Sequence, residues 1–263
     1  MLFDAFISPA NVLKHLWRKT NLGSLEFRSR YDFVHKPQYA WGLLSAAKIA
    51  KALGYKSFSV IEFGVAYGEG LVQLEKLIIA IKREYQLDVK CFGFDSGQGL
   101  PKPASYKDLP YLWTEGDFNG SQAHFENLKK KLRFSEIILG DVKTTIPSFI
   151  KNFDSSSPLG FISFDLDLYS STRDSFSIFS LKDECMLPRI PLYFDDISSS
   201  DHGYFNAFTG ELLAIDEFND KSQLNKVCPI HGFQLGRKIS STWNAGAYCF
   251  HRFNHPLYCE KIV

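Results

Sequence analysis

Short apolar runs alternate along the chain with segments in which apolar residues recur every three or four positions. A short apolar run is typical of a buried strand, and the wider spacing is typical of a helix with one buried face. The runs lie at Phe58–Ile61, Val89–Phe94, Glu136–Leu139, Phe161–Phe164 and Ile190–Phe194. The expected helices lie at Tyr39–Leu53, Leu71–Glu84, Ser121–Leu132, Ser171 to about Pro188 and Glu211–Phe218, with a short one at Thr144–Pro147.

This alternation predicts an α/β fold in which a mostly parallel, doubly wound, Rossmann-like sheet carries helices on both faces. Two last strands, Phe233–Ile239 and Ala247–Phe253, are expected to form an antiparallel hairpin that completes a seven-stranded sheet. We expect one domain over residues 39–263. Residues 1–38 are expected to form a helical extension that caps this domain, with a short helix from Asn11 to Trp17.

Basic residues in the extension have two interpretations. They could line a substrate entrance, but a solvated surface is the favoured interpretation because charged runs are usually exposed. The residues concerned are Arg28, Arg30, His35 and Lys36.

Charge and composition exclude several classes of function. The chain has 263 residues, with 30 Lys and Arg against 29 Asp and Glu, so its charge does not favour nucleic acid or an anionic membrane as partner. No apolar run approaches the roughly 20 residues of a membrane-spanning helix, and residues 1–10 lack the basic start of a signal peptide. Five cysteines without paired spacing indicate reduced thiols, so we expect a cytoplasmic protein without a disulfide framework or a zinc site.

The most informative stretch is the turn that follows the first strand. It contains Glu62, Gly64, Gly68 and Gly70 in the spacing E-x-G-x-x-x-G-x-G. A glycine-rich turn from a strand into a helix lets the backbone approach a ligand and directs N–H groups at it. The spacing differs from the G-x-G-x-x-G of dinucleotide-binding folds, and the Lys-Ser/Thr pair of a P-loop is absent. The turn is therefore a candidate cofactor loop, with an ordinary tight strand–helix turn as the alternative.

Acidic residues end the second and third strands. Asp95, followed by Ser96, ends the second strand, where a carboxylate can accept hydrogen bonds from both hydroxyls of a ribose. A turn aspartate is the alternative. Asp141, followed by Val142, ends the third strand and could accept from an adenine amino group, although a helix-initiating acid explains it equally well.

The fourth and fifth strands both end in doubled acids. Asp165 and Asp167 follow the fourth strand, and Asp195 and Asp196 follow the fifth. If these strands are neighbours, Asp165, Asp195 and Asp196 lie close together, and like charges at that distance require protonation or a cation. Oxygen ligands suit Mg²⁺ or another hard divalent ion. Helix caps are the alternative, and Ser171 with Asp174 resembles a capping pair at the start of the next helix.

Two loops could contribute to a site. Residues 101–120 form a long connection rich in aromatic residues and prolines, which favours a packed, substrate-facing loop. His202 lies in a polar loop after the fifth strand and could act as a base, although an exposed loop histidine is the favoured interpretation.

Taken together, these pieces resemble the macrocin O-methyltransferase family, a group of class I S-adenosylmethionine (SAM) enzymes that methylate sugar hydroxyls of natural-product glycosides. The most specific string is Asp165-Leu166-Asp167-Leu168-Tyr169-Ser170-Ser171-Thr172. The other matching pieces are Ile61–Val65 with Gly68 and Gly70, Phe94–Ser96 with Gly99–Pro101, Gly140 with Thr145–Pro147, and Phe194–Asp196. The family's Gly-Gly turn before the fifth strand is replaced here by Pro188–Pro191.

The resemblance implies a role for each candidate residue. The methionine part of SAM would be held by Glu62, Gly64, Val65, Gly68 and Gly70, its ribose by Asp95 with Ser96, and its adenine by Asp141 and Val142. A Mg²⁺ ion held by Asp165, Asp195 and Asp196 would orient and acidify the acceptor hydroxyl, and Asp165 could double as the general base.

The resemblance implies that residues 39–263 form a SAM-dependent O-methyltransferase domain that acts on a small hydroxylated acceptor such as a sugar or glycoside. One alternative is a Mg²⁺-dependent enzyme for a catechol-like or polyketide hydroxyl. Another is a methyltransferase-fold binding protein without turnover. The glycine spacing disfavours a nicotinamide-dependent reductase. Relatives of this kind are often oligomers, so a homo-oligomer is possible, and the identity of the acceptor stays open.

Overall fold

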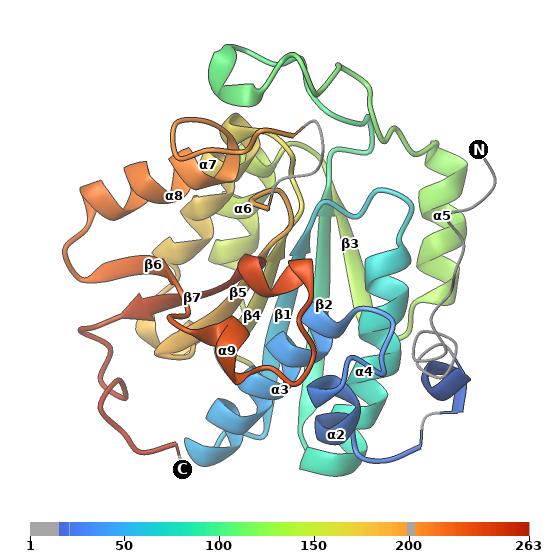
Figure 1. Cartoon of the computed structure of the whole chain (residues 1–263), viewed down its shortest axis with the longest axis vertical. Coiled ribbons are helices and arrows are strands. Elements are labelled where there is room, and N and C mark those ends of the chain that lie inside the picture. The colour runs from blue at the N-terminus through green and yellow to red at the C-terminus, as the bar shows by residue number, and fades with distance from the viewer. Residues whose placement is uncertain (1–15, 21, 199–202, 263) are drawn as a thin grey trace.

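A seven-stranded sheet forms the centre of the molecule, with the strand order β3-β2-β1-β4-β5-β7-β6 (Figure 1). The computed structural model describes residues 16–20, 22–198 and 203–262. Neighbours among the first five strands are parallel, whereas β7 runs antiparallel to β5 and β6. The strands are β1 (Ser57–Phe63), β2 (Asp88–Asp95), β3 (Ser135–Leu139), β4 (Leu159–Phe164), β5 (Arg189–Phe194), β6 (Asn225–Pro229) and β7 (Ala247–Arg252). The predicted Rossmann-like α/β fold is confirmed.

Helices cover both faces of the sheet, as predicted. On one face lie α3 and α4, with α5 beside α4, and on the other lie α6, α7 and α8 (Figure 1). The α-helices are α2 (Leu25–Arg30), α3 (Pro37–Ala52), α4 (Glu69–Tyr85), α5 (Gln122–Lys131), α6 (Val142–Lys151), α7 (Tyr169–Ser175), α8 (Gly210–Lys221) and α9 (Phe233–Gly236). Shorter 3-10 turns are η1 (Tyr106–Asp108), η2 (Phe176–Ser180), η3 (Asp183–Cys185) and η4 (Thr242–Gly246). Among the helices of the described residues, none is both long and apolar enough to cross a membrane.

The antiparallel strand pair near the end of the chain forms, but one of its strands was wrongly predicted. The partner of β7 is β6, and residues 233–236 of the predicted strand form α9 instead. Gly232, with φ of 70°, turns the chain before α9. Phe233 then packs against Trp41 and Trp243, with ring centroids 5.1 and 5.6 Å away. Packing among aromatic rings therefore determines the conformation of this segment.

Helix α7 begins at Tyr169 rather than at Ser171, so the predicted capping pair of Ser171 and Asp174 is wrong. Both residues lie inside the helix. The Ser170 N–H group in the first turn donates to the Asp108 carboxylate at 2.8 Å. The start of α7 is thus satisfied by a residue 62 positions earlier in the chain, a partner that local sequence does not reveal.

The N-terminal extension packs against the C-terminal part of the chain. The predicted helix at residues 11–17 falls mostly outside the described residues, and 16–20 are helical. Asp32, which is fully buried, accepts from Arg237 Nη2 at 2.7 Å and from Trp243 Nε1 at 3.3 Å. Arg237 also stacks over Trp243 at 4.8 Å. The extension is therefore joined to the domain by a buried ion pair.

A row of phenylalanines crosses the sheet on the face covered by α6 and α7. Phe94, Phe63, Phe164 and Phe194 sit in register near the carboxyl ends of four neighbouring strands, and all are fully buried. Successive ring centroids along the row are 5.0, 5.3 and 4.7 Å apart. Close packing of this kind fixes the strand ends, and the next residue of each strand begins the candidate site.

Candidate active site

The turn between β1 and α4 has glycines where side chains would collide with neighbouring atoms. Gly64 has φ of 86°, and a Cβ atom there would meet the carbonyl oxygen of Asp165. Gly68 has φ of 79° and directly precedes α4. A Cβ atom on Gly70 would meet the carboxylate of Glu62. The glycine spacing is therefore required both by backbone conformation and by the close approach of β4 and Glu62.

Glu62 is a buried acid on the side of β1 that faces α3. The Tyr39 hydroxyl donates to its Oε1, while Oε2 has no partner among the described residues. Burial raises the pKa of Glu62 to about 7, and nearby Lys36 opposes this shift. An unpartnered buried carboxylate oxygen at the base of a glycine turn fits a cationic ligand group such as the ammonium of SAM.

Asp95 holds the glycine turn in place. Its Oδ2 accepts from the N–H groups of Val65 and Ala66 at 3.0 and 2.9 Å, and its Oδ1 accepts from Gly97 at 2.8 Å. The N–H groups of Val65 and Ala66 in the glycine turn are therefore both bound to Asp95. A carboxylate offers about four acceptor positions, so about one is left for a ribose hydroxyl while the turn keeps this geometry.

The other candidate cofactor residues lie on turns along the same edge of the sheet. The Ser96 hydroxyl donates to Gly99 O at 2.8 Å. Asp141 precedes α6, and its Oδ1 accepts from the Lys143 N–H group at 2.8 Å, as a helix-capping acid does. Val142 is the buried first residue of α6. The capping interpretation of Asp141 is thus confirmed, and contact with adenine stays a prediction.

Three carboxylates meet beyond β4 and β5. Ligand oxygens of Asp165, Asp167 and Asp196 lie within 4.8 Å of one another. The group contains two of the three predicted metal ligands, with Asp167 in place of Asp195. Asp167 has φ of 62°, which turns the chain after β4, and its N–H group donates to Asp196 Oδ2 at 3.2 Å. Asp195 is exposed beside the group, and its Oδ1 accepts from the Tyr193 hydroxyl at 2.8 Å.

Desolvation and mutual repulsion make this group unfavourable when it is fully ionised. Both effects, desolvation first, raise the pKa of Asp165 and Asp196 well above the usual range and that of Asp167 to about 7. Oxygen donors with these properties fit a hard divalent cation, which would offset the repulsion. Among the described residues, this is the one set of His, Cys, Asp and Glu side chains with such spacing.

A fourth acid, which the sequence analysis did not single out, supports the group from α8. Glu211 is fully buried, and its Oε2 accepts from the Asp196 N–H group at 3.1 Å. Its Oε1 has no partner in the described part of the chain, and desolvation together with Asp196 raises its pKa well above the usual range. The sequence signal was an acid in the first turn of a predicted helix, which usually indicates only a favourable helix start.

Hydrogen bonds join the two ends of the connection after β2, and Asp108 attaches its middle to α7. Leu100 N donates to Asp117 O at 2.8 Å, and Gly116 N donates to Leu100 O at 2.9 Å. Buried Asp108 accepts from Ser170 N at 2.8 Å. Hydrogen bonds therefore hold this loop, but the aromatic packing predicted for it is not observed, since Tyr106, Tyr111 and Phe118 are exposed. Its contact with substrate stays a prediction. Figure 1 shows the loop, in green, across the end of the sheet. His202 lies outside the described residues.

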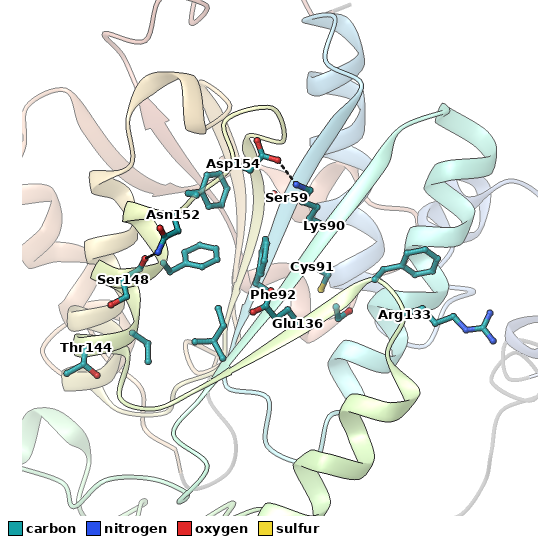
Figure 2. Close-up of a pocket in the computed structure, with 16 residues that line it drawn as sticks. Ser59, Lys90, Cys91, Phe92, Arg133, Glu136, Thr144, Ser148, Asn152 and Asp154 are labelled. Carbon is teal, nitrogen blue, oxygen red and sulfur yellow. Dashed lines mark hydrogen bonds and ion pairs between the residues drawn. The ribbon is translucent and has the colours of Figure 1, made fainter.

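A groove of about 800 Å³ lies elsewhere, between α6 and the outer strands β2 and β3 (Figure 2). Its lining includes the apolar residues Phe92, Ile138 and Phe149, together with Thr144 on α6 and Asn152 directly after this helix. β3 is the edge strand, so α6 leaves part of this face uncovered. No candidate cofactor or metal residue is among those that line the groove in the described chain.

Comparison with known proteins relates the chain to methyltransferases by fold. No protein-family profile matches it, and no curated protein matches it. It is similar to the calicheamicin methyltransferase CalS11, with 18% identity and a TM-score of 0.54 over 94% of this chain and 94% of that one. It is also similar to the O-methyltransferase NovP, with 15% identity and a TM-score of 0.55 over 92% of this chain and 99% of that one. The chain therefore has the fold of these methyltransferases over nearly its whole length.

Proposed function

We propose that the protein is a SAM-dependent O-methyltransferase acting on a hydroxyl of a small acceptor. The observation that carries this proposal is the arrangement at one edge of the sheet. A glycine turn lies beside a group of three carboxylates, and next to the turn is a buried carboxylate oxygen of Glu62 that has no partner within residues 16–20, 22–198 and 203–262. In sheets of this type, ligands bind beyond the carboxyl ends of the strands.

The chain's own residues supply the cofactor site in this proposal. Glu62 and the turn from Gly64 to Gly70, including Val65 and Gly68, hold the methionine part of SAM. Asp95 accepts from a ribose hydroxyl with its remaining acceptor position, next to Ser96. Asp141 and Val142 border the adenine. Support comes from Asp95, whose contacts to the turn join the two halves of this site.

Asp165, Asp167 and Asp196 hold a divalent cation, with Asp195 beside them. The ion, when bound, lowers the pKa of the acceptor hydroxyl and fixes its direction. Asp165 accepts the proton of this hydroxyl, and His202 is the second candidate for that role. Orientation of the acceptor toward the sulfonium methyl is the main contribution of the protein.

The acceptor is proposed to be a sugar or glycoside, on the resemblance of the string at residues 165–172 to enzymes of that class. One observation favours a second candidate, a catechol-like or polyketide hydroxyl. Tyr106 and Tyr111 on the loop after β2 are 68% and 61% exposed, and exposed aromatic rings can stack on a planar acceptor.

A methyl-transfer assay tests this proposal. SAM with a labelled methyl group is incubated with free sugars, glycosides and catechols, with Mg²⁺ or with a chelator, and products are identified by mass spectrometry. We expect transfer to oxygen that requires the cation and is lost in Asp165→Asn. Asp154→Asn, an exposed acid paired with Lys90 at the opposite end of the sheet, is the matched control. Transfer that persists with the chelator or in Asp165→Asn, or a protein that does not bind SAM, would contradict the proposal.

A further inference from the structure

Lys36 is a half-buried cation at the start of α3, and none of the ion pairs among the described residues includes it. Its Nζ lies 5.5 Å from the centre of the Tyr39 ring. A partly desolvated ammonium group without a carboxylate partner is unfavourable unless a ligand supplies the negative charge.

Tyr39 contacts both Lys36 and Glu62, the acid beside the glycine turn that follows β1. Its hydroxyl donates to Glu62 Oε1, and the second oxygen of Glu62 is buried without a partner in the described chain. The side chain of Tyr39 is 1% exposed, so its position is fixed. Lys36 and Glu62 therefore both contact one buried residue, Lys36 over the ring of Tyr39 and Glu62 at its hydroxyl, next to the glycine turn.

The electrostatics agree with this geometry. Lys36 lowers the pKa of both Glu62 and Asp165, against the larger effect of desolvation. The charge of Lys36 therefore acts on Glu62, beside the glycine turn, and on Asp165, in the carboxylate group. An α-amino acid carries an ammonium and a carboxylate group on the same carbon atom, and this is the charge pattern that Lys36 and Glu62 complement.

We propose that Lys36 and Glu62 together bind the amino-acid end of the cofactor. Lys36 pairs with the carboxylate, and Glu62 accepts a hydrogen bond from the ammonium group. This inference rests on the proposed function, and it assigns a cofactor-binding residue to the N-terminal extension. The boundary expected between residues 38 and 39 then passes through the cofactor site rather than between two units.

Two related ligands isolate this contact. S-adenosylhomocysteine carries the amino-acid end, whereas 5′-methylthioadenosine has the same adenosine and sulfur without it. Calorimetry with Lys36→Met should show S-adenosylhomocysteine binding weakened by about tenfold or more, since a charge-assisted pair is lost. Affinity for 5′-methylthioadenosine should stay unchanged, and Lys36→Arg should retain most of the affinity for S-adenosylhomocysteine.

Lys48→Met is the matched control, because Lys48 lies on the same helix in an exposed ion pair with Glu26. An equal loss for both ligands, or no loss for either, would overturn the inference. So would a Lys36→Met protein that binds S-adenosylhomocysteine normally but has an altered Mg²⁺ affinity, because Lys36 would then serve the carboxylate group. If the wild type does not bind S-adenosylhomocysteine at all, the proposed function fails, and the inference fails with it.

Discussion

At the scale of single residues, the strand ends follow a repeated pattern. Each of four neighbouring strands reaches a buried phenylalanine, and the next residue is Gly64, Asp95, Asp165 or Asp195. Side chains alternate along a strand, so the row of rings occupies one face while the residues after it begin the site. Packing of the phenylalanine rings thus holds the strand ends, and with them the aspartates, in place. Without it, the cost of desolvation and the repulsion between carboxylates would favour their separation.

Asp167 gives the first prediction. Its carboxylate belongs to the group with Asp165 and Asp196, so Asp167→Asn should remove most of the thermal stabilisation that Mg²⁺ gives to the wild type. Asp154→Asn should keep this stabilisation, because Asp154 lies in an exposed pair with Lys90. Melting curves with and without MgCl₂ measure the effect. Full stabilisation by Mg²⁺ in Asp167→Asn would show that this acid is not a ligand.

Glu62 gives a prediction about pH. Burial raises its pKa from the ordinary 4.5 to about 7, so the unfolded chain loses this proton at lower pH than the folded protein does. The stability that results is fully present below about pH 4 and is lost as the pH rises through about 7. Between about pH 4 and 8, the free energy of unfolding of the wild type should fall by about 3 kcal/mol relative to Glu62→Gln.

Urea unfolding of both proteins across this pH range provides the measurement. The carboxylates beyond β4 titrate in both proteins, so the difference between the two curves reports Glu62 together with its smaller repulsion of Asp165. Parallel curves would mean that the pKa of Glu62 is not raised in the folded protein.

At the scale of elements, the N-terminal extension and the segment around α9 hold each other in place. Asp32 is fully buried, and its partner Arg237 is 11% exposed, so the loss of one charge leaves the other desolvated. Asp32→Asn retains a side chain that tolerates the positive φ of this position. We expect it to lower the free energy of unfolding by about 3 kcal/mol.

Glu26→Gln is the control for this prediction, because Glu26 and Lys48 form an exposed pair worth under about 1 kcal/mol. Chemical denaturation of the two variants measures the loss in the free energy of unfolding for the buried pair and for the exposed pair. Similar small effects in both would contradict a structural role for the buried pair.

The sequence predicted the central strands because they are buried on both faces and therefore apolar throughout, as Phe161–Phe164 illustrates. It missed β6, where only Val227 of five residues is buried. It assigned a strand to residues 233–239, where contacts of Phe233 with distant tryptophans stabilise a helical turn. It also misplaced the start of α7, which depends on Asp108. The errors at α9 and α7 have their cause in tertiary contacts, whereas β6 lacks an apolar pattern because most of it is not buried.

At the scale of the whole molecule, the position of the candidate site was predictable from the sequence, but the grouping of its side chains was not. The doubled acids could be placed at one edge from sequence, because parallel strands end together there. Which carboxylates meet depends on features that local sequence does not report. Asp167 enters the group through a positive φ, Tyr193 binds Asp195, and Glu211 arrives from α8.

The fold brings the two halves of the proposed reaction to one edge of the sheet. The glycine turn follows β1, and the carboxylate group follows β4 and β5. In the sheet, β4 is the neighbour of β1 on that side, and β5 comes next. The close approach of Gly64 to the Asp165 carbonyl is where these halves meet. Binding of the cofactor and binding of the cation are therefore expected to influence each other.

Calorimetric titration of S-adenosylhomocysteine into the wild-type protein tests the central claim most directly. We predict one site per chain with micromolar affinity and no comparable binding of NAD or NADP. A separate Mg²⁺ titration should give a binding isotherm that Asp196→Asn abolishes. A protein that binds neither S-adenosylhomocysteine nor SAM would contradict the assignment as a methyltransferase.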